Sequence, residues 1–385
     1  MRPSRRQLGV AAGVVGALVV GLIGAEVVLR LEPHLLPETA QLRLHWRDTA
    51  DAVPKVPDPE LGFTHPPHQS GEVTSGDFTF SFTTNEKGFR SKEPWPAQAD
   101  VVVIGDSQTF GFGVDDEEHW VALLDGTMDG AEVVNLGING TGPTQHHLLL
   151  EAYKDELEPQ TVVLGLFPGQ ALGAAAEFEA WVEAGRPGTF LDHREQDDTS
   201  PLWKRAIYWA MERSHLVLLA RSVADGLRTP YPGSTLEIDG GRVSFTPYIW
   251  AGHADAGEPG DHRFELVMEG VERVQATAER EGMGFLVVLF PTKEEVYLPM
   301  LGKPVPNLTP PFADALKARG IPFIDLLPHF RARAAKGERL FLEIDIHPNA
   351  RGYALIADAV RQRLEEDASR MAKMESARES RVRRN

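Results

Sequence analysis

The sequence predicts an α/β protein in which helices cover both faces of a parallel β-sheet, in a three-layer α/β/α sandwich. The first observation is a set of short apolar runs typical of buried parallel strands, at residues 100–104, 132–134, 161–164, 285–290 and 322–324. The second is a set of helical patterns between and after these runs, at residues 119–124, 145–157, 264–282, 311–319 and 350–364. Alternating strands and helices indicate a parallel sheet, whose ligands bind beyond the carboxyl ends of the strands.

One long segment interrupts this alternation between the third and fourth predicted strands, at about residues 171–260. It contains a helical run over 203–226 and a hairpin pattern over 235–243, with Asp239-Gly240 as the turn. We interpret the segment as an insertion, a cap or lid that could shape the substrate site. Its aromatic residues could form a small core of their own; they are Trp203, Tyr208, Trp209 and Trp250.

The N-terminus predicts a membrane anchor. Arg2, Arg5 and Arg6 precede an uncharged stretch at 8–25, and roughly 18 helical residues reach about 27 Å, close to the thickness of the hydrocarbon core of a bilayer. Arginines on this side indicate a cytoplasmic N-terminus and an exported body in a single-pass protein of a bacterial-type cell membrane. The alternative is a signal peptide that is cleaved to release a secreted protein, although the best cleavage site, at 23–25, is poor.

The rest of the chain divides into three further parts after the stub and anchor at 1–31. Residues 32–98 form a proline-containing stalk and a lead-in, where alternating apolar and polar residues at 78–82 predict a strand. Residues 99–364 form the main domain, and 365–385 form a charged tail predicted to be a frayed helix or disordered.

Composition excludes several classes of function. The net charge of −17 argues against nucleic acid as a partner. The chain has no cysteine, which excludes disulfides, thiolate metal sites and a cysteine nucleophile. Gly111-Phe112-Gly113 lacks the third glycine of a dinucleotide fingerprint, and no P-loop lysine is present. We expect neither a metal nor an organic cofactor, since the serine chemistry predicted below needs none. The oligomeric state stays open.

A candidate nucleophile follows the first predicted strand, at Gly105-Asp106-Ser107. A serine on a tight turn at the carboxyl edge of the sheet exposes its hydroxyl, and neighbouring backbone N–H groups point to the same space. That arrangement favours attack on an acyl carbon and stabilises the resulting oxyanion. The alternative is a plain strand-to-helix turn in which Asp106 or Ser107 caps the helix.

A candidate base lies near the other end of the chain, at Asp345-Ile346-His347, just before the last predicted helix. A carboxylate two residues from a histidine can orient the ring and fix its tautomer. We therefore predict Ser107 as nucleophile, His347 as base and Asp345 as orienting acid. The alternative is that Asn349 caps the helix and the histidine only lies in a loop.

These motifs together resemble the SGNH (GDSL-type) hydrolases. Ser107 stands in the family's serine block, residues 134–141 resemble the block that carries an oxyanion glycine, and 345–352 resemble the histidine block. The resemblance covers roughly 100–364 apart from the insertion. It implies a flavodoxin-like sandwich, the SGNH hydrolase fold. It also implies an esterase acting on acetyl or other short-chain acyl esters, whose oxyanion is bound by the N–H groups of Ser107 and Gly140.

The run from Asn85 to Arg90 resembles a segment that often precedes the serine block in membrane-anchored members.

The chain departs from the family pattern at two places. The third block normally supplies an asparagine to the oxyanion hole, whereas residues 165–170 contain none and Gln170 is the nearest amide. Losing one oxyanion donor costs about 100- to 1,000-fold in rate. The family's aspartate commonly stands three residues before the histidine, where this chain has Ile344, so Asp345 represents a variant spacing and Glu343 is the alternative acid.

Residues 291–297 resemble a segment of exported polysaccharide O-acetyltransferases related to alginate acetylation, although those enzymes usually place the Asp-His pair before the serine. Lys293 in this segment could equally be a surface lysine in a loop. Esterase is therefore the first prediction, on an acyl ester that could be an acetylated carbohydrate. The alternatives are an O-acyltransferase that modifies a cell-envelope polysaccharide, and a catalytically degenerate binding protein. The missing asparagine supports the last of these.

Overall fold

The computed structural model describes residues 5–37, 40–41, 43–44, 52–75, 78–128, 130–196, 202–226, 234–245, 259–305 and 307–382. Its centre is a five-stranded sheet in the order β11-β10-β7-β5-β6, with every pairing parallel. The strands are β5 (Val101–Gly105), β6 (Val133–Gly137), β7 (Thr161–Leu166), β10 (Gly284–Leu289) and β11 (Phe323–Asp325). Each coincides with an apolar run, so the prediction of a parallel sheet is confirmed.

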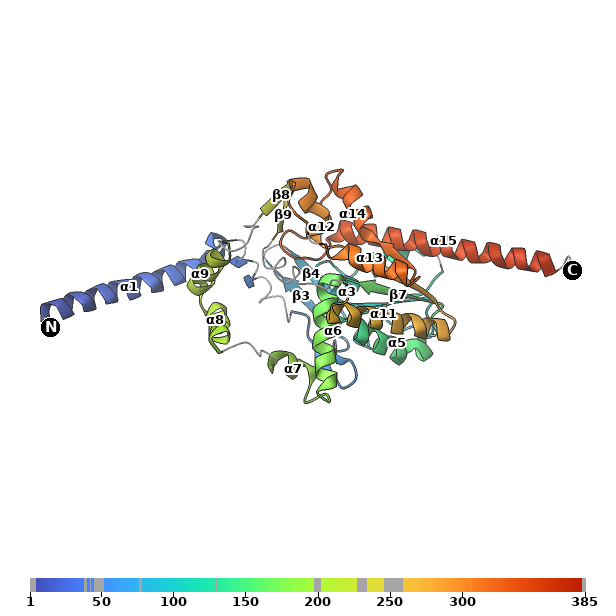
Figure 1. The fold of residues 1–385 in the computed structure, drawn as a ribbon, viewed down its shortest axis with the longest axis horizontal. Coiled ribbons are helices and arrows are strands. Elements are labelled where there is room, and N and C mark those ends of the chain that lie inside the picture. The colour runs from blue at the N-terminus through green and yellow to red at the C-terminus, as the bar shows by residue number, and fades with distance from the viewer. Residues whose placement is uncertain are drawn as a thin grey trace.

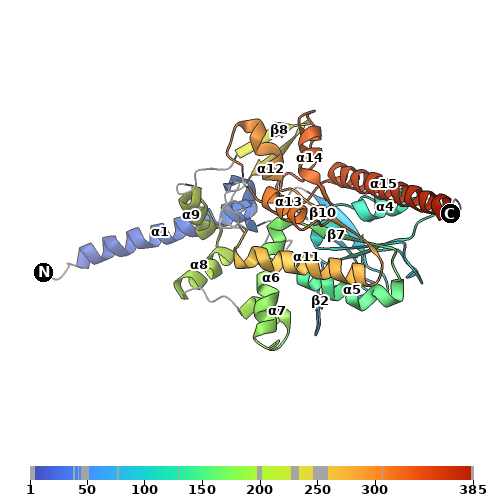
Figure 2. The ribbon, with the colours of Figure 1, turned by 45° about the vertical axis from the view of Figure 1, so that its right-hand side comes forward.

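Helices cover both faces of the sheet, which confirms the three-layer sandwich (Figures 1 and 2). The first core cluster joins one face to α5 (Pro143–Leu157), α6 (Pro168–Glu183), α11 (His262–Arg280) and α13 (Thr309–Ala318). The second joins the other face to α4 (Trp120–Thr127), α12 (Lys293–Tyr297), α14 (Leu326–Ala334) and α15 (Ala350–Val382). Alternate strand residues such as Val102 and Val103 enter opposite clusters, because successive side chains of a strand point to opposite faces.

The insertion begins later than the sequence indicates. Phe178 and Trp181 of α6 belong to the first core cluster, so this helix is part of the main sandwich and the boundary near residue 171 was set too early. Phe190 of α7 (Phe190–Gln196) belongs to the same cluster, and the hairpin of β8 (Ser234–Ile238) and β9 (Gly241–Phe245) contributes to the second core cluster. Of the described elements in this segment, α8 (Leu202–Arg213) and α9 (His215–Gly226) lie outside both clusters. The helical run and the hairpin are confirmed.

The predicted aromatic core of the insertion is wrong for Trp203 and Trp209, which are 60% and 59% exposed. Aliphatic side chains make that core instead: Met211 and Leu218 pack against Leu29 of the N-terminal helix. Trp250 and the side chain of Tyr208 lie outside the described part of the chain.

The lead-in forms two antiparallel hairpins, β1 (Val56–Asp58) with β2 (Gly62–Thr64) and β3 (Ser70–Thr74) with β4 (Thr79–Thr83). The strand expected at 78–82 is therefore present. Phe80 and Phe82, its inward residues, pack against Phe110 and Phe112, which follow Ser107. The lead-in thus supports the segment that carries the candidate nucleophile.

The two terminal helices project from opposite ends of the molecule (Figure 1). At one end, α1 (Arg5–Leu31) contains a stretch, Ala12–Leu31, that is long and apolar enough to cross a membrane. At the other, α15 continues through the charged tail to Val382, where the sequence predicted a frayed helix or disorder. Short 3-10 turns occur at Pro33–Leu35 and Leu298–Leu301.

Candidate active site

Ser107 opens a one-turn helix, α3 (Ser107–Phe110), directly beyond the carboxyl end of β5. Asp106 caps this helix by accepting a hydrogen bond from the Gln108 N–H at 2.9 Å. Gly105 permits the tight turn, because a Cβ there would lie 2.2 Å from the Thr109 hydroxyl oxygen. The two interpretations of this motif are compatible, since Asp106 is the cap and Ser107 is left to face the site.

The structure brings Ser107 together with His347, 240 residues away in the chain. The Nε2 atom of His347 lies 2.7 Å from Oγ of Ser107, and its Nδ1 atom lies 2.5 Å from Oδ1 of Asp345. Because a carboxylate can only accept, Nδ1 carries the proton and the lone pair of Nε2 faces the serine hydroxyl. This geometry suits removal of the serine proton.

Asp345 is fully buried and also accepts the backbone N–H of His347 at 2.9 Å. The alternative acid, Glu343, points elsewhere, since its carboxylate pairs with Arg242 at 2.6 Å. Ile344, at the family's commoner acid position, has no titratable group. Among the hydrogen bonds of the described residues, Asp345 is the one acid of these three positions that bonds to the imidazole of His347.

Lys293 is a buried residue beneath this loop rather than the surface lysine that the sequence allowed. Its ammonium donates to three consecutive backbone carbonyl oxygens, those of Glu343, Ile344 and Asp345, at 3.3, 2.5 and 3.0 Å. An ammonium group has three donors, which these three carbonyls match. Lys293 therefore holds the backbone on which Asp345 is placed.

The other side of the imidazole packs against Phe112, with ring centroids 4.9 Å apart. The carbonyl of Phe112 accepts a hydrogen bond from the hydroxyl of Tyr353 at 3.0 Å. Tyr353 lies on α15, the helix that follows His347. The ring of His347 is thus held between its own loop and the segment after Ser107.

Two candidate oxyanion donors lie in the segments that follow the two strands beside β5. Gly140 lies in the turn after β6, with φ of +82°, and Gln170 lies half-buried in the first turn of α6, after β7. Because β6 and β7 are the two neighbours of β5, the segments that carry these residues leave the sheet on opposite sides of β5. Among the contacts of the described residues, none joins the Gln170 amide to Ser107. The N–H of Ser107 is one of the first of its helix, which have no intrahelical acceptor.

His65 of the lead-in holds the oxyanion turn, a contact that the sequence did not indicate. Its Nδ1 atom lies 2.8 Å from the Pro54 carbonyl oxygen, and its Nε2 atom accepts the N–H of Asn139 at 3.2 Å. Burial lowers the pKa of His65 to about 4, with the Pro54 carbonyl opposing the shift. The imidazole is therefore neutral and keeps one tautomer.

Burial raises the pKa of the Asp106 carboxyl to about 7, while the Gln108 N–H and the charge of His347 oppose this shift. Asp106 thus adds no full negative charge directly beside Ser107 at acidic pH.

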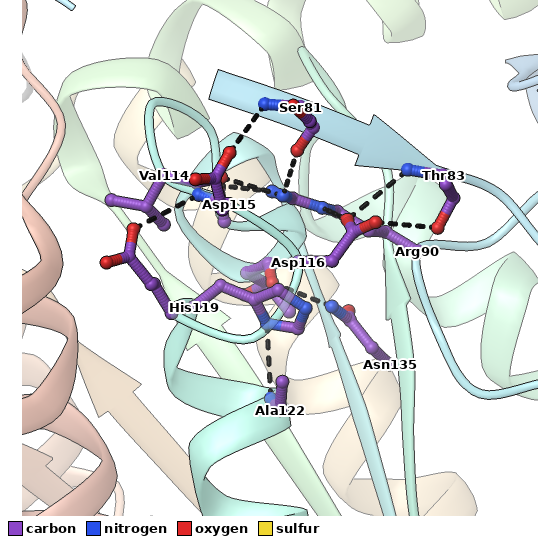
Figure 3. A network of polar contacts seen from close by, with 12 residues as sticks. Ser81, Thr83, Arg90, Val114, Asp115, Asp116, His119, Ala122 and Asn135 are labelled. Carbon is purple, nitrogen blue, oxygen red and sulfur yellow. Dashed lines mark hydrogen bonds and ion pairs between the residues drawn. The ribbon is translucent and has the colours of Figure 1, made fainter. Parts of the chain in front are cut away.

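Arg90 ties the lead-in to the loop that follows Ser107 (Figure 3). Its guanidinium is buried and donates to the carbonyl oxygens of Gly111, Val114 and Ser81 at 2.6, 2.7 and 2.9 Å. It also forms an ion pair with Asp116 at 2.6 Å. We call these contacts of Arg90 the clamp. Its one signal in the sequence is that the run from Asn85 to Arg90 resembles a segment that precedes the serine block in membrane-anchored SGNH hydrolases.

The turn that begins this run is stabilised by the side chain of Asn85 and requires a glycine at position 88. Asn85 accepts the N–H groups of Lys87 and Phe89 at 3.0 and 3.1 Å. Gly88 has φ of +87°, and a Cβ there would lie 2.1 Å from the carbonyl oxygen of His65. The turn therefore joins the two lead-in residues, His65 and Arg90, that hold the site.

Comparison with known proteins gives one family and a set of solved structures. Residues 252–384 match the family described as "SGNH hydrolase-like domain, acetyltransferase AlgX", a part that contains His347 and Asp345 but not Ser107. No curated protein matches the chain.

Solved structures with similarity include a member of the lipolytic protein G-D-S-L family from Veillonella parvula, with 14% identity and a TM-score of 0.36 over 68% of this chain and 96% of that one. The esterase EstA from Pseudoalteromonas has 14% identity and a TM-score of 0.35, covering 70% of this chain and 99% of its own. The acetyl xylan esterase AlAXEase has 14% identity and a TM-score of 0.35, covering 68% and 97%.

Proposed function

We propose that the chain is a member of the SGNH hydrolase-like family and an exported serine esterase acting on acetyl or other short-chain acyl esters; the family match over residues 252–384 supports the first part. The observation that carries the proposal is the continuous hydrogen-bonded series from Ser107 through His347 to Asp345. The partner is an acyl ester, which could be an acetylated carbohydrate. The net charge of −17 argues against nucleic acid.

In the proposed mechanism, Ser107 Oγ attacks the ester carbonyl carbon while its proton passes to Nε2 of His347. Asp345 stabilises the imidazolium through Nδ1–H. The carbonyl oxygen becomes an oxyanion, which the N–H groups of Ser107 and Gly140 and the amide of Gln170 bind. The C–O bond to the alcohol then breaks, the alcohol takes the proton from His347, and an acyl-enzyme remains. Water then attacks the acyl carbon while His347 takes its proton. The bond between this carbon and Ser107 Oγ breaks, the serine takes the proton back from His347, and the acid is released.

A second candidate is acyl transfer, in which a polysaccharide hydroxyl replaces water in the last step. Two observations favour it: the family match is to an acetyltransferase description, and residues 291–297 resemble a segment of polysaccharide O-acetyltransferases. In this chain that segment supplies Lys293, which holds the Asp345 loop. The two candidates share every step up to the acyl-enzyme.

For localisation we propose that α1 spans a bacterial-type cell membrane, with the N-terminus in the cytoplasm and the catalytic domain on the exported side. The exposed apolar side chains of Ala12–Leu31 support a span, and the arginines before it support this orientation. The alternative is secretion after cleavage of a signal peptide. N-terminal sequencing of the protein recovered from its host distinguishes the two.

The testing experiment is labelling of the full chain in detergent with a fluorophosphonate, followed by mapping of the labelled peptide. We expect labelling at Ser107 that is lost in Ser107→Ala and His347→Ala. A folded wild-type protein that takes no label would contradict serine catalysis and favour the degenerate binding protein. Product analysis with an acetyl ester donor, with and without a polysaccharide acceptor, then separates hydrolysis from transfer.

A further inference from the structure

Helix α8, in the insertion, exposes large apolar side chains. Leu202 is 80% exposed and Trp203 and Trp209 are 60% and 59% exposed. Large exposed side chains of this kind, gathered on one short helix, are typical of an interaction surface. The role first expected for these tryptophans, a small core, is filled by other residues.

The position of α8 is fixed by contacts between α9 and α1. The Glu26 carboxylate accepts the Ser214 hydroxyl at 2.9 Å and the N–H groups of His215 and Leu216 at 3.0 Å each, at the start of α9. Arg30 donates to the carbonyl oxygen of Arg213, the last residue of α8. Both helices lie at the end of the molecule from which α1 projects, in both views (Figures 1 and 2).

Charge separates this segment from the rest of the chain. The protein carries a net charge of −17, yet residues 202–226, which span α8 and α9, contain four basic residues against two acidic ones, Glu212 and Asp225. The basic residues are Lys204, Arg205, Arg213 and Arg221. The guanidinium of Arg213 lies over the ring of Trp209, 4.7 Å from its centroid. A short helix with exposed tryptophan and leucine and an excess of Lys and Arg has the composition of helices that lie in the interface of an anionic bilayer.

We infer that α8 and α9 form a membrane-docking surface that lies in the headgroup region of the same bilayer that α1 spans, an inference that rests on the proposed anchor. The uncharged stretch of α1 ends at Ala25, so Glu26 and its partners at 213–216 lie where the helix leaves the hydrocarbon core. From there the twelve residues of α8 reach about 18 Å along the bilayer surface. Trp203 and Trp209 enter the interface, and Arg213, which lies over the Trp209 ring, meets anionic lipid headgroups.

A consequence is that the insertion fixes how the catalytic domain stands on the membrane. A single helix alone would leave the domain free to turn about its tether. A second contact beside it restricts the domain to orientations in which the α8–α9 side faces the bilayer.

The experiment uses the full chain in vesicles of phosphatidylglycerol and phosphatidylcholine. Because the chain has no cysteine, single substitutions accept an environment-sensitive fluorophore at one position each: Trp203→Cys, Trp209→Cys, Leu22→Cys in α1 and Lys373→Cys on exposed α15. We expect blue-shifted emission and quenching by spin-labelled lipids for the two α8 probes, at a depth of about 5–10 Å. The Leu22 probe should lie deeper, and the Lys373 probe should behave as in water.

The controls separate this inference from the proposals on which it rests. If the α8 probes match the Lys373 probe while Leu22 is protected, the docking surface is excluded and the anchor stands. If Leu22 is not protected either, the anchor fails and the docking surface fails with it. Fluorophosphonate labelling of each variant at Ser107 reports the catalytic proposal independently of both outcomes.

Discussion

Asp345 bonds to His347 through one ring nitrogen, Nδ1. A change at Asp345 should therefore act on the tautomer and orientation of this imidazole. In Asp345→Asn, the amide could present an N–H to Nδ1 of His347, so the ring would turn or adopt the tautomer that places a proton on Nε2. We expect kcat to fall about 10⁴-fold, the loss typical of this change in a Ser-His-Asp triad. The assay is hydrolysis of a p-nitrophenyl ester.

Glu343→Gln is the matched control, because it removes the other carboxylate of the same loop and only breaks the pair with Arg242. It should keep kcat near wild type. A greater loss in Glu343→Gln than in Asp345→Asn would make Glu343 the orienting acid.

In the proposed mechanism, Gln170 decides whether two or three groups of the protein donate to the oxyanion. If its amide reaches the oxyanion, Gln170→Ala should lower kcat about 100- to 1,000-fold with little change in KM, because the bond forms only in the transition state. Gln170→Asn, which installs the family's residue, should retain more activity than Gln170→Ala. Equal rates for wild type and Gln170→Ala, measured with the same ester, would show that the N–H groups of Ser107 and Gly140 suffice.

At the scale of elements, the lead-in is tied to the main domain by a buried guanidinium. Arg90→Met would leave three carbonyl oxygens without their donor and Asp116 without its cation. Leaving a buried acceptor without its donor costs about 1–3 kcal/mol, and we expect a loss of at least that size in the free energy of unfolding from urea titration. Arg361→Ala on exposed α15, which removes i,i+3 and i,i+4 pairs, should cost less than about 1 kcal/mol. Equal losses in the two variants would refute the clamp.

The second tie between lead-in and domain depends on pH. Burial lowers the pKa of His65 to about 4 from its ordinary 6.5, so between these values the unfolded chain holds a proton that the folded chain lacks. The free energy of unfolding therefore rises with pH through this window, and His65 contributes fully above pH 6.5. As pH falls from 6.5 to 5, this histidine alone should cost about 2 kcal/mol.

His65→Gln can keep both hydrogen bonds without titrating, so its stability should fall less over that interval. His119 and His146, whose pKa values burial also lowers, leave a residual slope. His329→Gln on the exposed side of α14 should follow the wild-type profile. A His65→Gln profile that overlays wild type would exclude this role.

The elements that the sequence predicted are those whose signal is local. Five apolar runs indicated five buried strands, because burial of a strand requires apolar residues within that strand. Asp239-Gly240 indicated a hairpin turn, because the backbone conformation of the turn favours these residues at the turn itself. The same holds for Ser107 and His347, whose neighbours in the chain place them at the sheet edge. Their roles as nucleophile and base stay predictions.

Contacts between residues distant in the chain could not be predicted from such local sequence patterns. Arg90 and Lys293 bind backbone carbonyls, which any residue carries, so no partner could be recognised in the sequence. For the same reason α6 was assigned to the insertion: its packing against α5 and α11 involves residues distant along the chain.

On the scale of the whole molecule, the chain is arranged along one direction, from α1 through α8 and α9 to the sandwich and α15 (Figure 1). The contact between α1 and α9 joins residues about 190 apart in sequence. The helix that we propose as an anchor is therefore also part of the support for the insertion. Removal of α1 should destabilise α8 and α9 of the insertion but leave the sandwich folded.

A chain that begins at residue 32 tests this coupling. It lacks Glu26, whose carboxylate satisfies the N–H groups of His215 and Leu216, and Leu29, which packs with Met211 and Leu218. The first N–H groups of α9 would then lose their acceptor, and α8 and α9 should open locally at low cost. Limited proteolysis should cut within 202–226 much faster than in the full chain. Fluorophosphonate labelling of Ser107 should proceed at its original rate, because both core clusters of the sandwich are intact. Unchanged proteolysis would show that α8 and α9 hold together without α1, and loss of labelling would show that α1 supports the catalytic domain itself.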